Sequence, residues 1–245
     1  MKNNKKKFKN RKFGVTLITL LLKPFLRIKI KNRENVDETH FPVVFVCNHY
    51  ELYGPMSAAV GLPYDFRPWI DNNVLDKEKT YNYVYKNSMQ TKRIPECFKK
   101  LWSSIAEKIG TWALNSFNPV PVKKDSLKEL KETFEVSADA LINGDNLLIF
   151  PENSHYEPDG KYNRNGVSTF YSGFARIGRD YYDKTGKSIT FYPIYSDKKH
   201  HTLTFGNAVT FNPNNPSAIE KHRIVTELNN ALITQSETNK INLKN

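Results

Sequence analysis

Cysteine is nearly absent from this sequence of 245 residues, which contains only Cys47 and Cys97. Two cysteines cannot form the disulfide framework of a small secreted domain, and these two lack the Cys-x-x-Cys spacing of a structural zinc site. We therefore expect a reducing compartment and no metal centre. Because Cys47 ends an apolar run, it is interpreted as a small core residue.

A long apolar run is also missing from the N-terminal region. A helix that spans a membrane needs about twenty apolar residues, whereas the apolar stretch Phe13–Leu22 has ten. It ends at Lys23-Pro24 without the small-residue pattern of a signal-peptide cleavage site. The sequence therefore predicts neither a spanning helix nor a cleaved signal.

Acidic residues are absent from residues 1–33, which contain twelve Lys and Arg. The other 25 basic residues balance all 25 acidic ones, so this N-terminal segment carries the whole net charge of +12. A nucleic-acid-binding protein usually displays its basic patch on the folded domain. We therefore expect no nucleic acid as a partner, and a nucleic-acid-associated protein that uses the basic segment is the most remote of three hypotheses.

A short apolar helix beside a polybasic tract suits the interface of an anionic membrane, where each nearby Lys or Arg contributes about 1 kcal/mol. We predict that residues 1–33 form a polybasic membrane-interface segment. The protein would then be a peripheral, monotopic protein on the cytoplasmic face of the cell membrane. The alternative is a helix that packs on the core of its own domain.

The rest of the chain, 34–245, has the length of a single α/β domain. Apolar runs predict strands and amphipathic patterns predict helices. The expected strands cover 26–30, 41–47, 66–70, a short part of 118–126, 147–150, 188–195 and 202–205. The expected helices cover 13–22, 55–60, most of 76–115, 127–142, 169–180 and 216–233. The predicted fold class is α/β, with a central mixed sheet flanked by helices and a short N-terminal interfacial helix.

One helical stretch carries a regular apolar stripe. Its members recur at helical spacing and predict one buried face: Phe98, Leu101, Trp102, Ile105 and Ile109. Such a stripe is more often core than a ligand site. It could also line a channel for an acyl chain, and periodicity does not separate the two interpretations.

A polar motif follows the first central strand. The apolar run Val43–Cys47 breaks directly into Asn48-His49. Ligands of open α/β sheets bind at such strand ends, and a histidine there can accept a proton at neutral pH. A loop histidine without a role is the alternative.

Two further motifs lie later in the chain. The apolar run Leu147–Phe150 breaks into Pro151-Glu152-Asn153-Ser154. Between the two strands, Lys123 and Lys124 stand just before a predicted helix, where the helix amides and an ammonium group both favour a phosphate. Lysine pairs are also common as plain surface charge.

The three motifs, in this order, resemble the bacterial glycerophospholipid acyltransferases of the 1-acylglycerol-3-phosphate acyltransferase family. The likeness extends roughly from Val43 to Phe205. It implies that His49 is a general base that takes a proton from an acceptor hydroxyl, which then attacks the thioester of acyl-CoA or acyl-carrier protein. It also implies that Glu152 contacts the glycerol portion of the acceptor and that Lys124, with Lys123 beside it, binds the acceptor's phosphate.

The sequence departs from the family at the acid that orients the histidine. The family has an aspartate five residues after the histidine, a position that is Gly54 here. Glu51 is the nearest acid and the predicted substitute, while Asp65 and Asp71 are remoter candidates.

The second motif departs from the family as well. Asn153 and Ser154 replace a glycine and a threonine, and His155 stands where the family has an arginine. Lys161 or Arg164 could compensate for that arginine.

The sequence therefore predicts an acyltransferase of lipid metabolism that acylates a lysophospholipid-like acceptor in a membrane. We expect His49, Lys124 and Glu152 to converge at one rim of the sheet. The predicted catalytic residues are His49 and Glu51, and the predicted substrate-binding residues are Asn48, Lys123, Lys124, Glu152, Asn153 and Ser154. No cofactor is implied beyond the acyl-CoA or acyl-carrier protein that donates the acyl group. The alternative is a catalytically impaired, membrane-associated lipid-binding protein of the same fold.

Overall fold

The computed structural model describes residues 13–50, 52–86, 95–153 and 167–241. The chain divides into two compact units. The first, called here the helical unit, comprises 1–18 and 67–133, and the second, the sheet unit, comprises 19–66 and 134–245. The predicted boundary between 33 and 34 stays a prediction.

The sheet unit is built on a mixed sheet. Its strands are β1 (Lys29–Lys31), β2 (Val43–Cys47), β5 (Leu147–Ile149), β6 (Thr190–Asp197), β7 (Thr202–Phe205) and β8 (Val209–Thr210). They follow the order β1-β7-β6-β2-β5, with β8 also paired to β6. The β2 strand is parallel to both β5 and β6, whereas β7 and β8 are antiparallel to β6.

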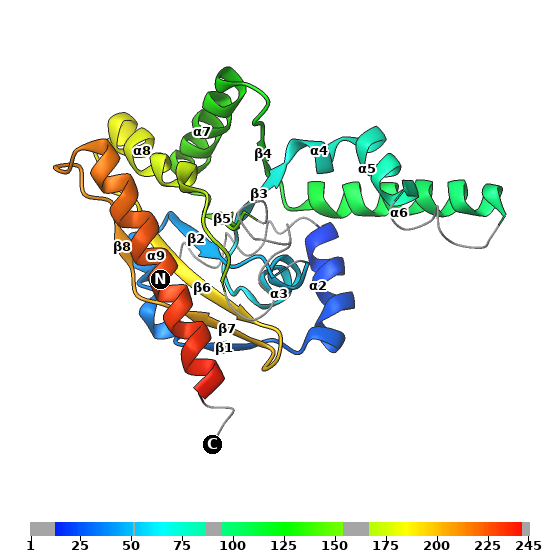
Figure 1. Cartoon of the computed structure of the whole chain (residues 1–245), viewed down its shortest axis with the longest axis horizontal. Helices are drawn as coiled ribbons and strands as arrows, with labels where there is room; N and C mark the ends of the chain where they lie inside the picture. The colour runs from blue at the N-terminus through cyan, green and yellow to red at the C-terminus, as the bar shows by residue number, and fades with distance from the viewer. Residues whose placement is uncertain (1–12, 51, 87–94, 154–166, 242–245) are drawn as a thin grey trace. The chain divides into compact units, whose positions relative to one another are not determined.

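Helices cover both faces of this sheet. Successive side chains of a strand point to opposite faces, so the contacts of each side chain show which helix covers its face. On one face, Phe45 of β2 belongs to the same buried cluster as Ala58 of α3 (Tyr53–Gly61). On the other face, the Tyr195 hydroxyl lies 3.2 Å from the Ser236 hydroxyl of α9 (Ser217–Ile241). Figure 1 shows α9 running along β6. The unit is therefore an α/β fold with a mixed central sheet flanked by helices, as the sequence predicts.

The remaining elements are short connectors or belong partly to the helical unit. The sheet unit also contains the 3₁₀ turns η2 (Arg33–Asn35), η3 (Glu38–His40) and η6 (Ser172–Arg176), and the helix α8 (Ile177–Thr185). The helical unit contains α4 (Asn72–Leu75), α5 (Lys77–Val84), α6 (Glu96–Ser116) and the parallel strands β3 (Arg67–Asp71) and β4 (Val120–Val122). Two helices, α2 (Phe13–Leu26) and α7 (Leu127–Ile142), have residues in both units.

Most predicted elements are confirmed, and α7 shows why. The helix covers 127–142 as expected, and its start is fixed by Ser126, whose hydroxyl accepts the Glu129 N–H at 3.2 Å. This is the capping contact that serine supplies at a helix N-terminus.

The predicted helix at 169–180 begins too early. Residues before η6 are extended instead, because the Tyr171 N–H donates to the Pro151 carbonyl at 2.7 Å and Phe170 forms a β-bridge with Glu152. The α-helix itself begins only at Ile177.

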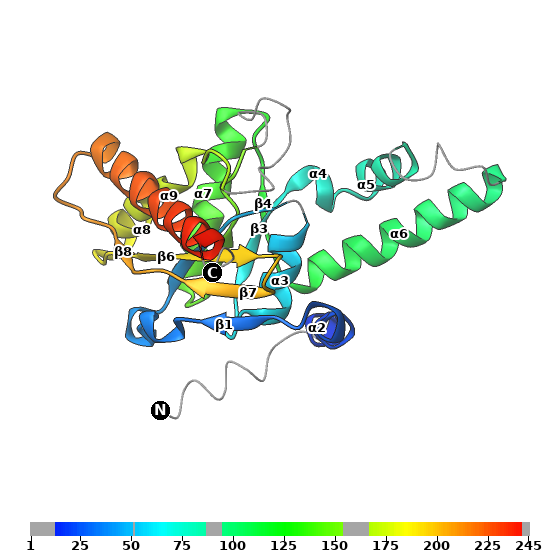
Figure 2. The same cartoon turned by 60° about the horizontal axis from the view of Figure 1, so that its bottom comes forward.

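The predicted burial of the apolar stripe on α6 is wrong. The helical spacing is right, but the stripe faces outward, and its side chains, with Trp112, keep 38 to 59 % of their surface exposed. The buried residues of α6 are Ser103, Glu107 and Thr111. The short helices α4 and α5 pack against α6 (Figure 2). The packing of α6 in the helical unit therefore buries its polar side and leaves its apolar side exposed.

The N-terminal helix α2 is longer than predicted and has 14 residues. Within the part of the chain that the structure describes, no helix is long and apolar enough to cross a membrane.

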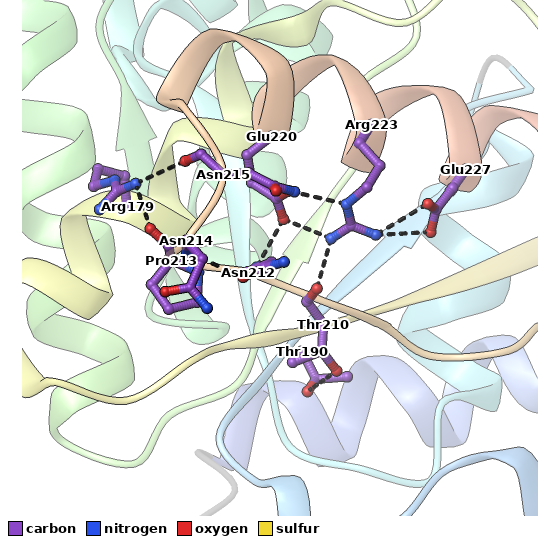
Figure 3. Close-up of polar contacts among 10 residues, drawn as sticks. All are labelled: Arg179, Thr190, Thr210, Asn212, Pro213, Asn214, Asn215, Glu220, Arg223 and Glu227. Atoms are coloured by element: carbon purple, nitrogen blue, oxygen red, sulfur yellow. Dashed lines mark hydrogen bonds and ion pairs between the residues drawn. The ribbon is translucent and has the colours of Figure 1, made fainter.

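A buried ion pair holds the start of α9 against β8. Glu220 is fully buried, and Arg223 donates to it, to Glu227 at 3.0 Å and to the Thr210 carbonyl at 2.7 Å (Figure 3). Burial alone would raise the pKa of the Glu220 carboxyl, but the hydrogen bonds from Arg223 and from the Asn212 N–H outweigh it and lower that pKa from 4.5 to about 2.

We predict that Glu220→Gln lowers the free energy of unfolding at neutral pH by about 1–3 kcal/mol, because a hydrogen bond to a charged group contributes that much. The wild-type carboxyl has its lower pKa in the folded state, so its contribution is complete above about pH 4.5 and is lost as the pH falls toward about 2. Urea unfolding of both proteins across this range should show their difference shrinking.

The matched control is Glu227→Gln, which alters the half-exposed partner of the same arginine. We expect it to change the free energy of unfolding by less than about 0.5 kcal/mol. An equal effect of the two substitutions would contradict the role given to Glu220.

Candidate functional site

The first and second motifs meet at one edge of the sheet. Because β2 and β5 are neighbouring parallel strands, their carboxyl ends lie at the same edge. The residues that follow them are in contact there: the rings of His49 and Phe150 pack edge to face, with centroids 5.5 Å apart. The sequence separates these two motifs by about a hundred residues, and the sheet brings them together.

Glu152 joins the two loops through its carboxylate. One of its oxygens accepts the backbone N–H groups of His49 and of Tyr50, the latter at 3.3 Å. The other accepts the backbone N–H of Ser168 at 2.7 Å. The side chain is buried, so these charge-assisted hydrogen bonds form where water competes little. Glu152 therefore fixes the backbone of the loop that carries His49.

The His49 loop contains a strained residue. Tyr50 has a φ of 41°, in the left-handed region that non-glycine residues rarely adopt. Its N–H is one of those that Glu152 accepts. Such strain persists where surrounding contacts determine the backbone, and it concentrates at functional sites.

Asn48 fixes the other side of this loop. Its side-chain oxygen accepts the Ser196 N–H at 2.6 Å, and its side-chain nitrogen donates to the Ser196 carbonyl at 3.1 Å. The amide thus continues the hydrogen bonding between β2 and β6 beyond the end of β2. The Ser196 hydroxyl lies 2.7 Å from that of Ser57, in α3. These contacts give Asn48 a positioning role, and its predicted contact with a substrate stays a prediction.

Gly54, at the position where the resembled family has an aspartate, has no room for a side chain. The Gly54 N–H donates to the His49 carbonyl at 3.0 Å. A Cβ at residue 54 would lie 2.3 Å from the carbonyl oxygen of Asn48 and 2.5 Å from that of His49. Real Cβ atoms do not approach backbone so closely. The glycine is therefore required by the path of this loop.

Several predicted site residues lie outside the part of the chain that the structure describes. They are Glu51, Ser154, Lys161 and Arg164. Asn153 is described, and its N–H donates to the Thr169 carbonyl at 3.0 Å. Of the remoter acids, Asp65 accepts the Asn146 side-chain amide through its backbone carbonyl.

The predicted phosphate-binding lysines lie in the helical unit, where both form ion pairs. The Lys124 ammonium is 2.7 Å from Asp71, and the Lys123 ammonium is 3.0 Å from Glu132. Burial raises the pKa of Asp71, but hydrogen bonds from Lys124 and the Asn73 N–H outweigh it, so that pKa lies below its ordinary value. The predicted convergence of Lys124 with His49 and Glu152 stays a prediction, whereas that of His49 with Glu152 is confirmed.

The sequence interpretation missed a group of polar side chains after β6. The His200 ring nitrogen Nδ1 lies 2.6 Å from the carboxylate of the mostly buried Asp197. His201 lies 3.3 Å from the Tyr53 hydroxyl, whose pKa is raised to about 12 by burial and by the charge of Asp197. Because β6 is parallel to β2, the carboxyl ends of the two strands share one edge of the sheet, and this group lies at that edge with His49.

A signal for this group was present in the sequence. Asp197-Lys-Lys-His-His201 follows an apolar strand, as Asn48-His49 does. In the sequence, 188–195 is predicted only as a strand, and no role is assigned to the polar residues that follow it.

Cys47 is excluded as a nucleophile although it directly precedes Asn48. The thiol is completely buried, and burial, with the nearby charge of Glu152, raises its pKa well above the ordinary value. A thiol in this state is protonated at neutral pH and unreactive.

The described residues contain no group of three or more His, Cys, Asp or Glu side chains that could hold a metal ion. Comparison of this chain with protein-family models, with curated protein sequences and with solved structures found no match. The likeness to the acyltransferase family therefore rests on the sequence motifs alone.

We predict that Gly54→Ala destabilises the fold by about 1–3 kcal/mol, because the new Cβ must displace backbone atoms of residues 48 and 49. Thermal unfolding checks this. Gly110→Ala is the matched control, since no atom lies within 4 Å of a Cβ built there. Gly110 lies within α6, so its replacement should stabilise by about 0.5–1 kcal/mol. Tolerance of alanine at residue 54 would contradict the described loop.

A second prediction concerns Glu152. We expect Glu152→Gln to lower the free energy of unfolding by about 2 kcal/mol or more, because one amide oxygen cannot replace a carboxylate that accepts three N–H groups. Hydrogen exchange should accelerate at the amides of His49, Tyr50 and Ser168. The exposed Glu132→Gln serves as control, and unchanged exchange at those three amides would disprove the contact.

Proposed function

We propose that this protein is an acyltransferase that moves a fatty acyl group from acyl-CoA or acyl-carrier protein to a hydroxyl of a lysophospholipid-like, 1-acylglycerol-3-phosphate type acceptor. His49 acts as the general base. The observation that carries the proposal is the hydrogen bonding of Glu152 to the backbone of the His49 loop, since it unites two motifs that resemble one family at one edge of a sheet.

In the proposed reaction, a ring nitrogen of His49 takes the proton of the acceptor hydroxyl. The oxygen attacks the thioester carbonyl and forms a tetrahedral intermediate. The carbon–sulfur bond then breaks, and the departing thiolate takes a proton, so one ester and one free thiol form for each acyl group transferred. Proton transfer of this kind contributes about 10²–10⁴ to a rate.

Glu51 is the proposed partner of the His49 imidazole, because the usual position of that acid is Gly54 and has no room for a side chain. The backbone of the loop is already held by Glu152 and by the Asn48 side chain. Orientation of the imidazole therefore does not depend on its acid alone.

Lys124, with Lys123 beside it, is the proposed site for the acceptor's phosphate. A phosphate that binds there exchanges with the carboxylate of Asp71 at Lys124. Lysine lacks the bidentate geometry of arginine, so this recognition is less strict in orientation than that of the family's arginine.

We further propose that the protein acts at the cytoplasmic face of the cell membrane as a peripheral, monotopic protein, and that the anionic lipid surface attracts its N-terminal cations.

A second candidate function is a catalytically impaired lipid-binding protein of the same fold. The close packing of Gly54 favours it, because the loop has no room for the family's orienting aspartate. Such a protein binds lysolipid without consuming thioester.

We predict that thiol release from long-chain acyl-CoA depends on lysophosphatidic acid in mixed micelles, and that His49→Ala reduces it by about 10²-fold or more. If no CoA substrate reacts, the acyl-carrier protein donor is tested in the same assay. Glu51→Gln should reduce kcat more than KM if this acid orients the base.

The matched control is His222→Ala, which removes an exposed histidine of α9 and should retain full activity. Full activity of His49→Ala with an intact fold would refute the role of His49. Lysolipid binding without turnover from either donor would favour the second candidate function.

A further inference from the structure

The outward stripe of α6 is an unusual surface for a helix that packs on other elements. It consists of six large side chains on one side of the helix: Phe98, Leu101, Trp102, Ile105, Ile109 and Trp112. Large contiguous apolar surfaces on a folded protein mark interaction sites. This set is called the α6 apolar face below.

The opposite side of the helix is polar and faces inward. Glu107 and Thr111 are buried there, and the Thr111 hydroxyl donates to the Glu107 carbonyl at 2.8 Å and also lies 3.3 Å from the Glu107 carboxylate. The helix has therefore placed its polar residues against the unit and its apolar residues outside. This is the reverse of the arrangement that water favours for a surface helix.

One exposed cation of α6 borders the α6 apolar face. Lys108 lies three residues after Ile105 and four before Trp112, and residues at this spacing are neighbours on a helix. Of the two acids of α6, Glu107 is buried, and Glu96, in the first turn, pairs with Lys99 at 3.9 Å. No carboxylate thus belongs to the face itself, which suits a partner that is apolar inside and anionic at its surface.

The face is continuous with the start of the N-terminal helix. A Cβ on Gly14 of α2 would lie 2.1 Å from the Ser116 hydroxyl oxygen and 3.1 Å from the Trp112 ring, so the first turn of α2 packs directly on the last turns of α6. The exposed Phe13 stands next to this contact in the chain. The first turn of α2 therefore adjoins the Trp112 end of the α6 apolar face.

We propose that the α6 apolar face lies in the interface of an anionic lipid bilayer, as a second membrane-contacting surface beside the N-terminal segment. Tryptophan favours the region between headgroups and acyl chains, and two of the six side chains are tryptophan. The stem of Lys108 can extend toward lipid phosphates while the apolar side chains insert. The helix lies in the plane of the interface and does not cross the bilayer.

The bilayer is preferred over a protein partner or a second copy because the surface is the convex side of a helix, contains two tryptophans and is bordered by Lys108. A second copy of this chain would bring a second Lys108 to the same contact. The proposal is independent of catalysis.

The test is cosedimentation of the full chain with vesicles of phosphatidylcholine that contain phosphatidylglycerol. Salt of about 0.5 M shortens the Debye length to roughly 4 Å and so suppresses binding through the polybasic sequence alone. We expect the double variant Trp102→Ser/Ile109→Ser to bind at least about tenfold more weakly than the wild type under these conditions. Both side chains are exposed, so the variant should retain the thermal stability of the wild type.

The control is Val74→Ser, which removes an exposed apolar side chain from α4 in the same unit and should leave vesicle binding unchanged. Insertion itself is tested in a variant with Trp69 and Trp112 replaced by Phe, whose Trp102 fluorescence should be quenched by brominated lipid. Equal binding of wild type and double variant, or no quenching, would overturn the proposal. A dimer in the wild type that the double variant abolishes, without any change in vesicle binding, would assign the face to a second copy instead.

Discussion

A buried carboxylate that accepts backbone N–H groups from two distant segments is the contact on which the candidate site depends. Glu152 follows β5, and its oxygens accept the N–H groups of His49 and Tyr50, which follow β2. They also accept the N–H of Ser168, which precedes η6. A charge buried in this way is costly unless it is fully hydrogen-bonded. The need to keep the Glu152 carboxylate hydrogen-bonded couples the positions of these loops. If the His49 loop shifted, the carboxylate would lose the N–H groups of His49 and Tyr50.

The same loop is constrained from two further directions. The Asn48 amide pairs with the Ser196 backbone, and Gly54 lies so close to residues 48 and 49 that it has no space for a Cβ. The backbone around His49 is thus held by hydrogen bonds and by close packing. In the proposed reaction, the acid that orients the His49 imidazole comes from a residue other than Gly54.

The sequence predicted the sheet well because its strands are apolar, β-branched and bounded by polar motifs. The β2 and β7 strands and the helix α7 have the expected bounds or lie within them. It could also predict that the residues after β2 and β5 meet, because the carboxyl ends of parallel strands share an edge. It could not predict that Glu152 would bind backbone, nor that Gly54 is sterically required, because both depend on the path of the loops. The prediction that the α6 apolar face is buried was wrong for a related reason. Periodicity identifies an apolar side of a helix, but it does not show which side the neighbouring elements cover.

The most direct test follows the acyl group itself. The wild-type protein is incubated with lysophosphatidic acid and a thioester donor that carries an isotopically labelled acyl chain, and the lipids are analysed by mass spectrometry. The account predicts a labelled diacyl product in equal amount to the thiol released. Labelled free fatty acid without diacyl product, or no reaction with either acyl-CoA or acyl-carrier protein while the protein still binds the lysolipid, would contradict it.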